Sequence, residues 1–446
     1  MKVTKILAAF PFMALSLLAA TPTVMPETFF PTLDGILKHA VQQSPRMLNR
    51  TLDLEIAEND RIQARAGLLP NLGGYGNYYQ TRDTRADLPG RLAVTKVSYN
   101  FSVNQPLFYW GERVNGAKMG DIRSNMAKGQ YRDGYRQLAQ TLRSDYMRLI
   151  VQKVAVQRVI FNLEYAKSQL AQEEERLAKK VISDAQIFGV RLNAEQAQIA
   201  CERAQYDFET MKASFARLSG AALPDEAIPD AIPVLTYDAP ALDRLLAGFL
   251  GQKDYPTTEA YVMRQQLEIE RLSYATSKTR LLPKLGAVLG VSQDEQSYTI
   301  NIAQRYKVNS IFGGISVNWN IFDGFAAGAN ERNALARRRQ VENDYRSLTD
   351  TLAQQAQTQV KQINFTARSM SIADRQLIAS ESTLKSRQDE FSRGVIAESD
   401  VSVTRLMLYD SIINAYNYRI EYLTRMGDFL GTIVEDPVVA NIVDTK

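Results

Sequence analysis

The sequence predicts a mainly α-helical chain with a membrane β-barrel portion, built from a duplicated unit of a strand hairpin and a long helix. Three observations support this prediction. Several short sequence motifs occur twice at a nearly constant spacing. Apolar residues recur every seven positions over long proline-free stretches, and apolar and polar residues alternate in a few shorter segments. Periods of this kind distinguish helices from strands.

The duplication is visible as matching phrases in the same order. "LLPNLG" begins at Leu68 and "LLPKLG" begins at Leu281, an offset of 213 residues. "FSVNQPLFYWGER" matches "ISVNWNIFDGFAA", and "KKVISDAQIFGVRL" matches "RGVIAESDVSVTRL", both at an offset of 214. Such a period is too long for a solenoid, so one unit is used twice.

The chain divides into five predicted parts. Lys2 and Lys5 precede an apolar run that ends near Ala20, as in a secretory signal peptide, and the run is short for the alternative of a membrane anchor. The parts are a signal peptide over 1–20, a first structural repeat over 21–222, a proline-rich linker with a short helix over 223–254, a second repeat over 255–431 and a short C-terminal tail over 432–446.

The seven-residue period predicts two very long helices, at about 111–179 and 324–393. Return helices follow at about 185–218 and 399–430, and shorter helices precede the strands at 45–67 and 257–280. A helix of about 70 residues is roughly 100 Å long, so two shorter helices end to end can lie beside it. This arrangement predicts the wall of a cylinder, although the helices alone do not exclude an ordinary two-stranded coiled coil.

Alternation of apolar and polar residues predicts the strands. It occurs in "KVSYNFSVN" and in "ISVNWNIF" (Ile315–Phe322), and partner strands are expected at about 73–82 and 286–298. Their length and the aromatic residues near their ends are typical of membrane-spanning strands. Four strands cannot close a barrel, and lipid tolerates no open sheet edge, so a membrane role requires several copies of the chain.

The composition excludes several classes of site. A net charge of +4 over 446 residues gives no indication of nucleic-acid binding. The single cysteine, Cys201, and the single histidine, His39, are too few for a zinc site of the Cys/His type. Both are expected to have packing or surface roles. No nucleophile, base and acid can be assembled, so we expect no catalytic residues, no metal, no cofactor and no enzymatic activity.

The duplicated unit, the phrase "LLPxLG", the phrase "QPLFYWGER" with its partner "NIFDGF", and "FSRGVIAESDV" together resemble the TolC family of outer-membrane efflux and secretion channels. The resemblance covers about residues 32–431. It implies a homotrimer with a twelve-stranded β-barrel in the outer membrane and an α-helical coiled-coil tunnel in the periplasm. It also implies a passive exit duct for efflux or type I secretion, with a periplasmic adaptor and an inner-membrane transporter as partners.

The resemblance further implies a pore aperture at the turns between long and return helices. Asp400 in "FSRGVIAESDV" stands where the family commonly has a pore-facing aspartate, and Glu398 and Asp184 are the related acidic residues. The alternative is that these carboxylates cap helix N-termini. Phe391 and Ile396 replace the tyrosine and arginine that usually help to close the aperture, so the sequence does not show how a closed state is held.

The same turns carry apolar residues where solvent exposure is expected. Val181, Ile182, Gly394, Val395 and Ile396 are therefore predicted to contact the adaptor, because apolar groups on an exposed tip indicate a docking surface. The alternative function is a soluble periplasmic coiled-coil structural or adaptor protein, whose strands would form a soluble β-domain. An enzyme is a more distant alternative.

Overall fold

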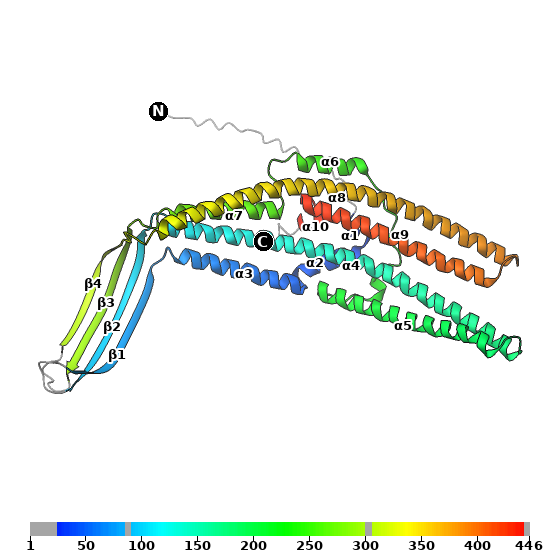
Figure 1. Ribbon diagram of the computed structural model, residues 1–446, viewed down its shortest axis with the longest axis horizontal. Coiled ribbons are helices and arrows are strands. Elements are labelled where there is room, and N and C mark those ends of the chain that lie inside the picture. The colour runs from blue at the N-terminus through cyan, green and yellow to red at the C-terminus, as the bar shows by residue number, and fades with distance from the viewer. Residues whose placement is uncertain (1–24, 85–90, 299–305, 441–446) are drawn as a thin grey trace, which may run out of the picture.

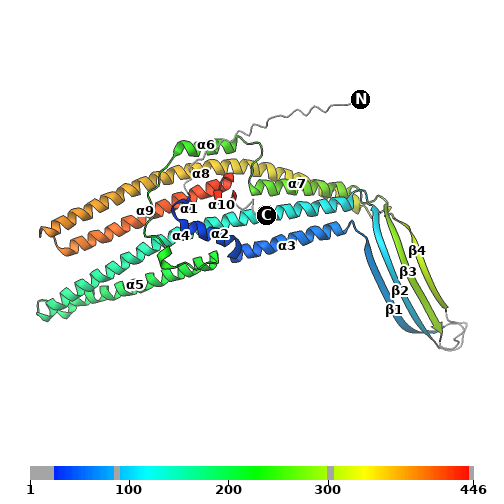
Figure 2. The same ribbon diagram turned by 180° about the vertical axis from the view of Figure 1, so that it is seen from behind.

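The computed structural model describes residues 25–84, 91–298 and 306–440. The chain forms an elongated wall of helices with a four-stranded sheet at one end (Figures 1 and 2). This architecture confirms the predicted mainly helical fold with a small sheet. The predicted signal peptide lies outside the described residues.

The helices follow the same order in both halves of the chain. The first half contains α1 (Pro26–Phe29), α2 (Pro31–Gln43), α3 (Pro45–Ala66), α4 (Glu112–Ala178) and α5 (Asp184–Ser219). The linker contains the 3₁₀ turn η1 (Asp225–Ala227) and α6 (Ala239–Leu250). The second half contains α7 (Thr258–Ser277), α8 (Ala326–Ser392), α9 (Glu398–Ile433) and α10 (Pro437–Ala440).

The long helices α4 and α8 are continuous over 67 residues each, as their proline-free, seven-residue period predicts. Along the predicted seam of α4, Leu142 and Leu149 are fully buried. On α8, Ala356 and Ile363 are equally buried, whereas Phe391 at the far end of the seam is exposed. The seam therefore packs along most of its length and opens only near the tip.

The helices lie side by side in a defined order across the wall. Figure 1 shows α3 and α5 end to end along one lateral edge, α4 beside them, then α7 and α9, and α8 along the other edge. The short helix α6 packs against α8. The lateral edges of the wall are therefore α3 with α5 on one side and α8 on the other.

The sheet is a four-stranded antiparallel meander in the order β1-β2-β3-β4, with β1 (Asn71–Thr84), β2 (Arg91–Phe108), β3 (Lys284–Tyr298) and β4 (Tyr306–Asn318). Its register places Leu72, Val103 and Leu289 opposite one another on one face. Asn71 and Asn104 lie opposite one another on the other face. The sheet thus has one mainly apolar and one mainly polar face, as the alternation predicts.

The predicted strand Ile315–Phe322 is wrong in its position. The strand β4 begins earlier, at Tyr306, and ends at Asn318, so Trp319 and Ile321 continue the alternating pattern without belonging to the ladder. The Trp319 indole Nε1–H donates to the carbonyl of Leu281 at 2.9 Å, a bond that satisfies the indole outside the sheet. Sequence alternation extends past the strand because these residues remain exposed beside it.

The joint between sheet and helices has an unusual backbone in both halves. Trp110 and Gly111 have φ of 51° and 84°, and Gly324 and Phe325, which match them at the offset of 214, have φ of 67° and 68°. Two consecutive left-handed residues turn the chain sharply before the long helix begins, and only one of each pair is glycine. The sheet bends away from the wall at this joint (Figure 1).

The main core lies at the middle of the wall, where α1, α2 and the C-terminal segment surround α4. Arg143 of α4 is buried, and its guanidinium forms ion pairs with Glu27 at 2.6 Å and with Asp436 at 2.7 Å. The tail after residue 431 is therefore ordered at least as far as α10, since Asp436 is itself buried. One arginine thus joins both ends of the described chain to the long helix.

Candidate functional site

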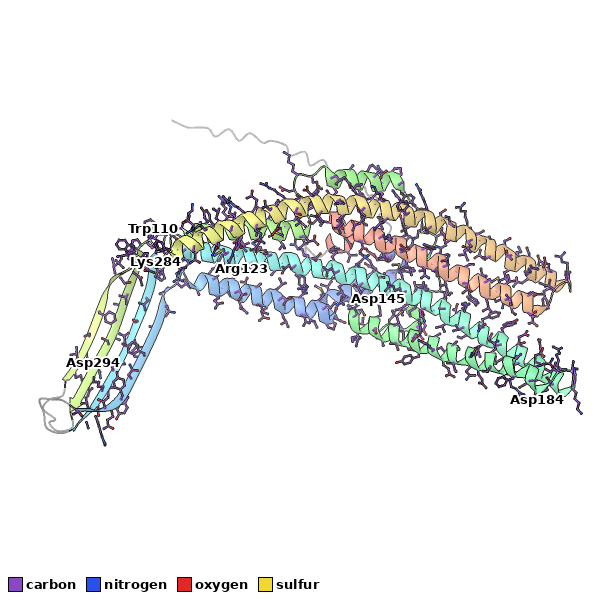
Figure 3. The ribbon with its side chains drawn as sticks, in the orientation of Figure 1. Trp110, Arg123, Asp145, Asp184, Lys284 and Asp294 are labelled. Carbon is purple, nitrogen blue, oxygen red and sulfur yellow. The ribbon has the colours of Figure 1, made fainter. Side chains whose placement is uncertain are left out.

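The candidate site consists of the two turns farthest from the sheet. The α4–α5 turn and the α8–α9 turn lie at the same end of the wall (Figure 1), and Asp184 is labelled at the first of them in Figure 3. They contain all eight residues predicted for the aperture and the adaptor contact. The structure brings these residues to one end of the molecule but divides them between two tips.

Each long helix ends in the same hydrogen-bonded turn. A left-handed residue follows the helix, Lys180 with φ of 57° in one tip and Gly394 with φ of 74° in the other. Two backbone hydrogen bonds of a Schellman motif close each turn. In the first tip, the Val181 N–H donates to the Arg176 carbonyl at 2.9 Å and the Lys180 N–H donates to the Leu177 carbonyl at 2.8 Å. In the second tip, the Val395 N–H donates to the Glu390 carbonyl at 3.0 Å and the Gly394 N–H donates to the Phe391 carbonyl at 2.8 Å.

The turn geometry leaves a valine side chain exposed on each tip. Val181 is 63% exposed and Val395 is 70% exposed, whereas the following isoleucines, Ile182 and Ile396, are half-buried. In a Schellman turn the residue at this place usually packs back on the helix. Here the valines stay exposed and form a small apolar surface on each tip.

The predicted aperture residues lie at the first turns of the return helices. Asp184 and Glu398 are the first residues of α5 and α9, and both are exposed. Asp400 is exposed as well, and its carboxylate accepts a hydrogen bond from the Ala397 N–H at 3.3 Å. This bond is the capping role considered as the alternative for Asp400. The pore role of all three acids stays a prediction.

Ser183 caps the other return helix in a comparable way. Its backbone N–H donates to the Gln186 side-chain oxygen at 2.8 Å. Gln186 therefore accepts the same backbone hydrogen bond in the first tip that Asp400 accepts in the second. The two tips therefore share a backbone but differ in charge, because only the second one has an acid at the third helical position. If the tips alternate around a ring, the acidic positions alternate with neutral ones.

The joint between sheet and wall is a second specialised region; the sequence indicated its aromatic residues but not the contacts that they make. The Trp110 indole donates to the carbonyl of Pro283 at 2.8 Å, and Lys284 forms an ion pair with Glu112 beside it (Figure 3). Lys284 also lies 5.6 Å from the centre of the Tyr109 ring. Aromatic and basic groups gathered at the base of a sheet are typical of a membrane–water interface. The signal was present as aromatic residues at the strand ends.

The described residues also include the side chains considered for a metal site, and a recess in the wall. No group of three His, Cys, Asp or Glu in this part of the chain could hold a metal ion, and Cys201 is buried. A recess of about 660 Å³ lies between α4, α7, α8 and α9, and its walls carry basic and acidic side chains together. No helix within the described ranges is both long and apolar enough to cross a bilayer.

Comparison with solved structures shows the same fold in outer-membrane channels. The Campylobacter jejuni CmeC outer membrane channel aligns with a TM-score of 0.67 and 12% identity, covering 93% of this chain and 89% of that one. The open state of the Neisseria gonorrhoeae MtrE outer membrane channel aligns with a TM-score of 0.64, 14% identity, and coverage of 90% and 89%. The Vibrio cholerae outer membrane protein VceC aligns with a TM-score of 0.62 and 14% identity, covering 93% of this chain and 98% of that one.

Comparison of sequences assigns the family. A search of curated proteins gave no match. The family model described as outer membrane efflux protein matches residues 36–221 and 262–426, which is most of both halves of the chain. The soluble adaptor considered as an alternative is therefore set aside. The chain belongs to the outer membrane efflux protein family and is an exit duct that lies in the outer membrane and extends into the periplasm.

Proposed function

We propose that three copies of the chain form one passive channel, the exit duct of a tripartite system with a periplasmic adaptor and an inner-membrane transporter. The observation that carries this proposal is the four-stranded sheet with its two free edges, β1 and β4. Backbone groups at such edges are not tolerated in lipid, so they must pair with edges of other copies. Three copies supply twelve strands, the number that the family resemblance implies.

The helical wall has matching free edges below the sheet. On α5, exposed apolar side chains recur at nearly heptad spacing, and on α8 a second exposed series follows the opposite edge. These residues are Phe188, Leu192, Ile199 and Tyr206 on α5, and Phe365, Ile372 and Ile378 on α8. Apolar stripes on both lateral edges support closure of the wall by the same neighbours that close the sheet.

The two faces of the sheet support a membrane channel with a hydrated interior. The apolar face, which includes Phe101, Val291 and Ile311, suits contact with lipid. The opposite face, which includes Ser102, Asn100 and Ser292, suits contact with water. Alternation of apolar outward and polar inward residues is the pattern of outer-membrane barrels that conduct solutes. The exposed valines of the tips, at the far end of the wall, suit contact with the adaptor.

The assembly is tested by crosslinking. We expect an amine-reactive crosslinker to convert detergent-solubilised protein from the outer-membrane fraction into covalent trimers, with no larger species at low protein concentration. The sheet provides the physical reason, since its apolar face and open edges need both detergent and neighbours. A monodisperse, water-soluble monomer would contradict the proposal.

A further inference from the structure

The internal duplication supplies a template for the contact between neighbouring copies. Within one chain, α4 of the first half packs against α7 of the second half. If copies form a ring, the next contact around it joins α8 to α3 of the neighbouring copy, and α8 and α3 are the duplicated counterparts of α4 and α7. We infer that the α8–α3 contact between copies repeats the observed α4–α7 packing and is specified by two ion pairs that the α4–α7 contact lacks. This inference rests on the proposed trimer.

The exposure of equivalent residues supports the template. Ile269 of α7 is 6% exposed because it is covered within the wall, whereas its counterpart Ile56 of α3 is 59% exposed. Tyr261 of α7 lies against Gly129 of α4, where an added methyl group would be 3.5 Å from the tyrosine ring. The counterpart of Tyr261 on α3, Leu48, is exposed. The free face of α3 is therefore the face that its counterpart buries.

Two observed contacts fix the register of the template. The Asn115 side chain of α4 donates to the Thr276 hydroxyl of α7 at 3.2 Å, and Gly129 faces Tyr261 one stretch further along the antiparallel pair. Between these contacts, residues 123–125 of α4 lie beside residues 266–268 of α7. The duplication converts this into residues 337–339 of α8 beside residues 53–55 of α3 in the neighbouring copy.

The distances of these residues from the sheet, measured along each helix, agree with that register. Arg337 and Arg339 lie 11 and 13 residues from the sheet-proximal end of α8, and Glu55 and Asp53 lie 11 and 13 residues from the sheet-proximal end of α3. At about 1.5 Å per residue, both pairs are roughly 16–20 Å from the joint with the sheet. The basic and acidic residues thus occur at the same level on opposite edges of the wall.

The charges are complementary across the proposed contact but incomplete within the chain. Residues two apart lie on opposite flanks of a helix. In antiparallel packing Arg337 therefore shares a flank with Asp53 and Arg339 shares the other flank with Glu55, and the members of each pair are offset by two residues, or roughly 3 Å, along the helix axis. At the α4–α7 contact the counterpart of Arg339 is Asn125, and the counterpart of Asp53 is Gln266. Each ion pair has therefore lost one member there, and both are complete only where two copies would meet.

The side chains are free to make these contacts. In the described part of the chain, Arg337, Arg339 and Glu55 have no ion-pair partner, and all three are exposed on the edge of the wall. Asp53 pairs with Arg50 at 3.2 Å, and both groups are exposed, so Asp53 can also reach a neighbour. Exposed ion pairs contribute little to stability, but charges that flank an apolar seam decide which helices pair. The ion pairs therefore make α8 select a neighbouring α3.

Charge reversal tests the ion pairs. We expect Arg339→Glu or Glu55→Arg alone to lower the trimer fraction in dilute detergent solution about tenfold, because three contacts each lose a pair and gain a repulsion. The double variant with both changes should return close to the wild-type fraction. The matched control is Arg123→Glu, the counterpart of Arg337 in the middle of the wall, which should leave the trimer fraction unchanged. A double variant no better than the single variants would overturn the assignment.

Cysteine crosslinking tests the register and separates this inference from the trimer itself. In a Cys201→Ser background, we expect Ala329→Cys with Gln63→Cys, the counterparts of Asn115 and Thr276, to give covalent trimers with a short bismaleimide. Either cysteine alone should give none. If an amine-reactive crosslinker gives trimers and the cysteine pair does not, the α8–α3 contact is wrong although the trimer stands. If neither reagent gives trimers, the proposed function fails as well.

Discussion

At the scale of single residues, Arg143 has the largest expected effect on stability. Burial acts to lower its pKa, but the hydrogen bonds and charges of Asp436 and Glu27 outweigh that effect and hold the pKa of the guanidinium above its ordinary value. The arginine therefore stays charged at any pH at which the protein is studied. A fully buried charge of this kind is stable only while both carboxylates accompany it.

We expect Arg143→Met to destabilise the protein by about 3–5 kcal/mol, because it leaves two carboxylates beside an apolar core without their cation. The measurement is chemical unfolding followed by circular dichroism. The control is the triple variant Arg143→Met, Glu27→Gln, Asp436→Asn, which removes all three charges and should recover much of the loss. If the triple variant unfolds as readily as the single variant, lost packing and not uncompensated charge is the cause.

Asp145 gives a pH-dependent prediction. Burial raises its pKa above the ordinary value of 3.8, against the opposing charges of Arg148 and Arg46. A carboxyl group with a raised folded-state pKa favours the folded state most below pH 3.8, and this contribution is lost as the pH rises through the folded-state pKa. We therefore expect Asp145→Asn to raise the melting temperature slightly at pH 7 and to have no effect below pH 3.8. An equal effect at both pH values would contradict this account.

Asp400 separates the two roles that its position allows. If its helix faces the tunnel, three copies form a ring of carboxylates that attracts cations. We expect Asp400→Asn to reduce the cation selectivity of single channels in planar bilayers and to weaken block by multivalent cations from the periplasmic side, with Glu398→Gln having less effect. Asparagine still caps a helix, so unchanged conduction in Asp400→Asn would mean that Asp400 only caps α9.

At the scale of elements, the two hairpin tips are the parts expected to meet another protein. We expect the double variant Val181→Asp, Val395→Asp to abolish export while leaving trimer yield unchanged, because the charges disrupt an apolar contact without touching the wall. Export is measured in cells that produce the partner proteins, and trimer yield in purified outer membranes. The control is Arg393→Asp, a charge change on the same tip outside the predicted surface. Normal export by the double variant would rule out these valines as the docking surface.

The elements also show how far the sequence alone can be read. The long and return helices begin and end within a few residues of the predicted positions, because seven-residue periods and prolines mark them clearly. The last strand was misplaced because Trp319 and Ile321 prolong the alternation beyond the ladder. The ion pair between Arg143 and Asp436 joins residues 293 apart, and no local pattern in the sequence indicates such a pair. The pore and adaptor roles of the tip residues also depend on other copies of the chain and on the adaptor, so one sequence alone does not determine them.

At the scale of the whole molecule, the duplication predicts how the sheets of neighbouring copies pair. Phe101 of β2 lies opposite Val291 of β3, and Ser102 lies opposite Gly290. The counterparts in a β4–β1 contact between copies are Ile315 opposite Tyr78 and Ser316 opposite Asn77. This register keeps apolar residues on the outer face, and a slip of one residue would turn every side chain to the wrong face.

We expect Ser316→Cys with Asn77→Cys, in a Cys201→Ser background, to form disulfides between copies and to give covalent trimers on non-reducing gels. Directly opposed residues in antiparallel strands have the Cα separation that a disulfide requires. The matched control is Ser316→Cys with Tyr78→Cys, whose side chains lie on opposite faces and should not crosslink. Efficient crosslinking of that control instead would show a shifted register.

The order of the strands has a consequence for how the molecule is made. β1 pairs with β2, and β3 with β4, across short connections, but β2 and β3 are separated by about 175 residues that include the longest helix of the first half. Closing so long a loop is slow compared with forming a hairpin. The two hairpins can therefore form early, whereas the central pairing waits until α4 and α5 have folded back and brought β3 alongside. The helices must therefore be in place before one chain has its four-stranded sheet, and several such sheets must pair before lipid accepts them, so we expect the helices to fold before the sheet enters the membrane.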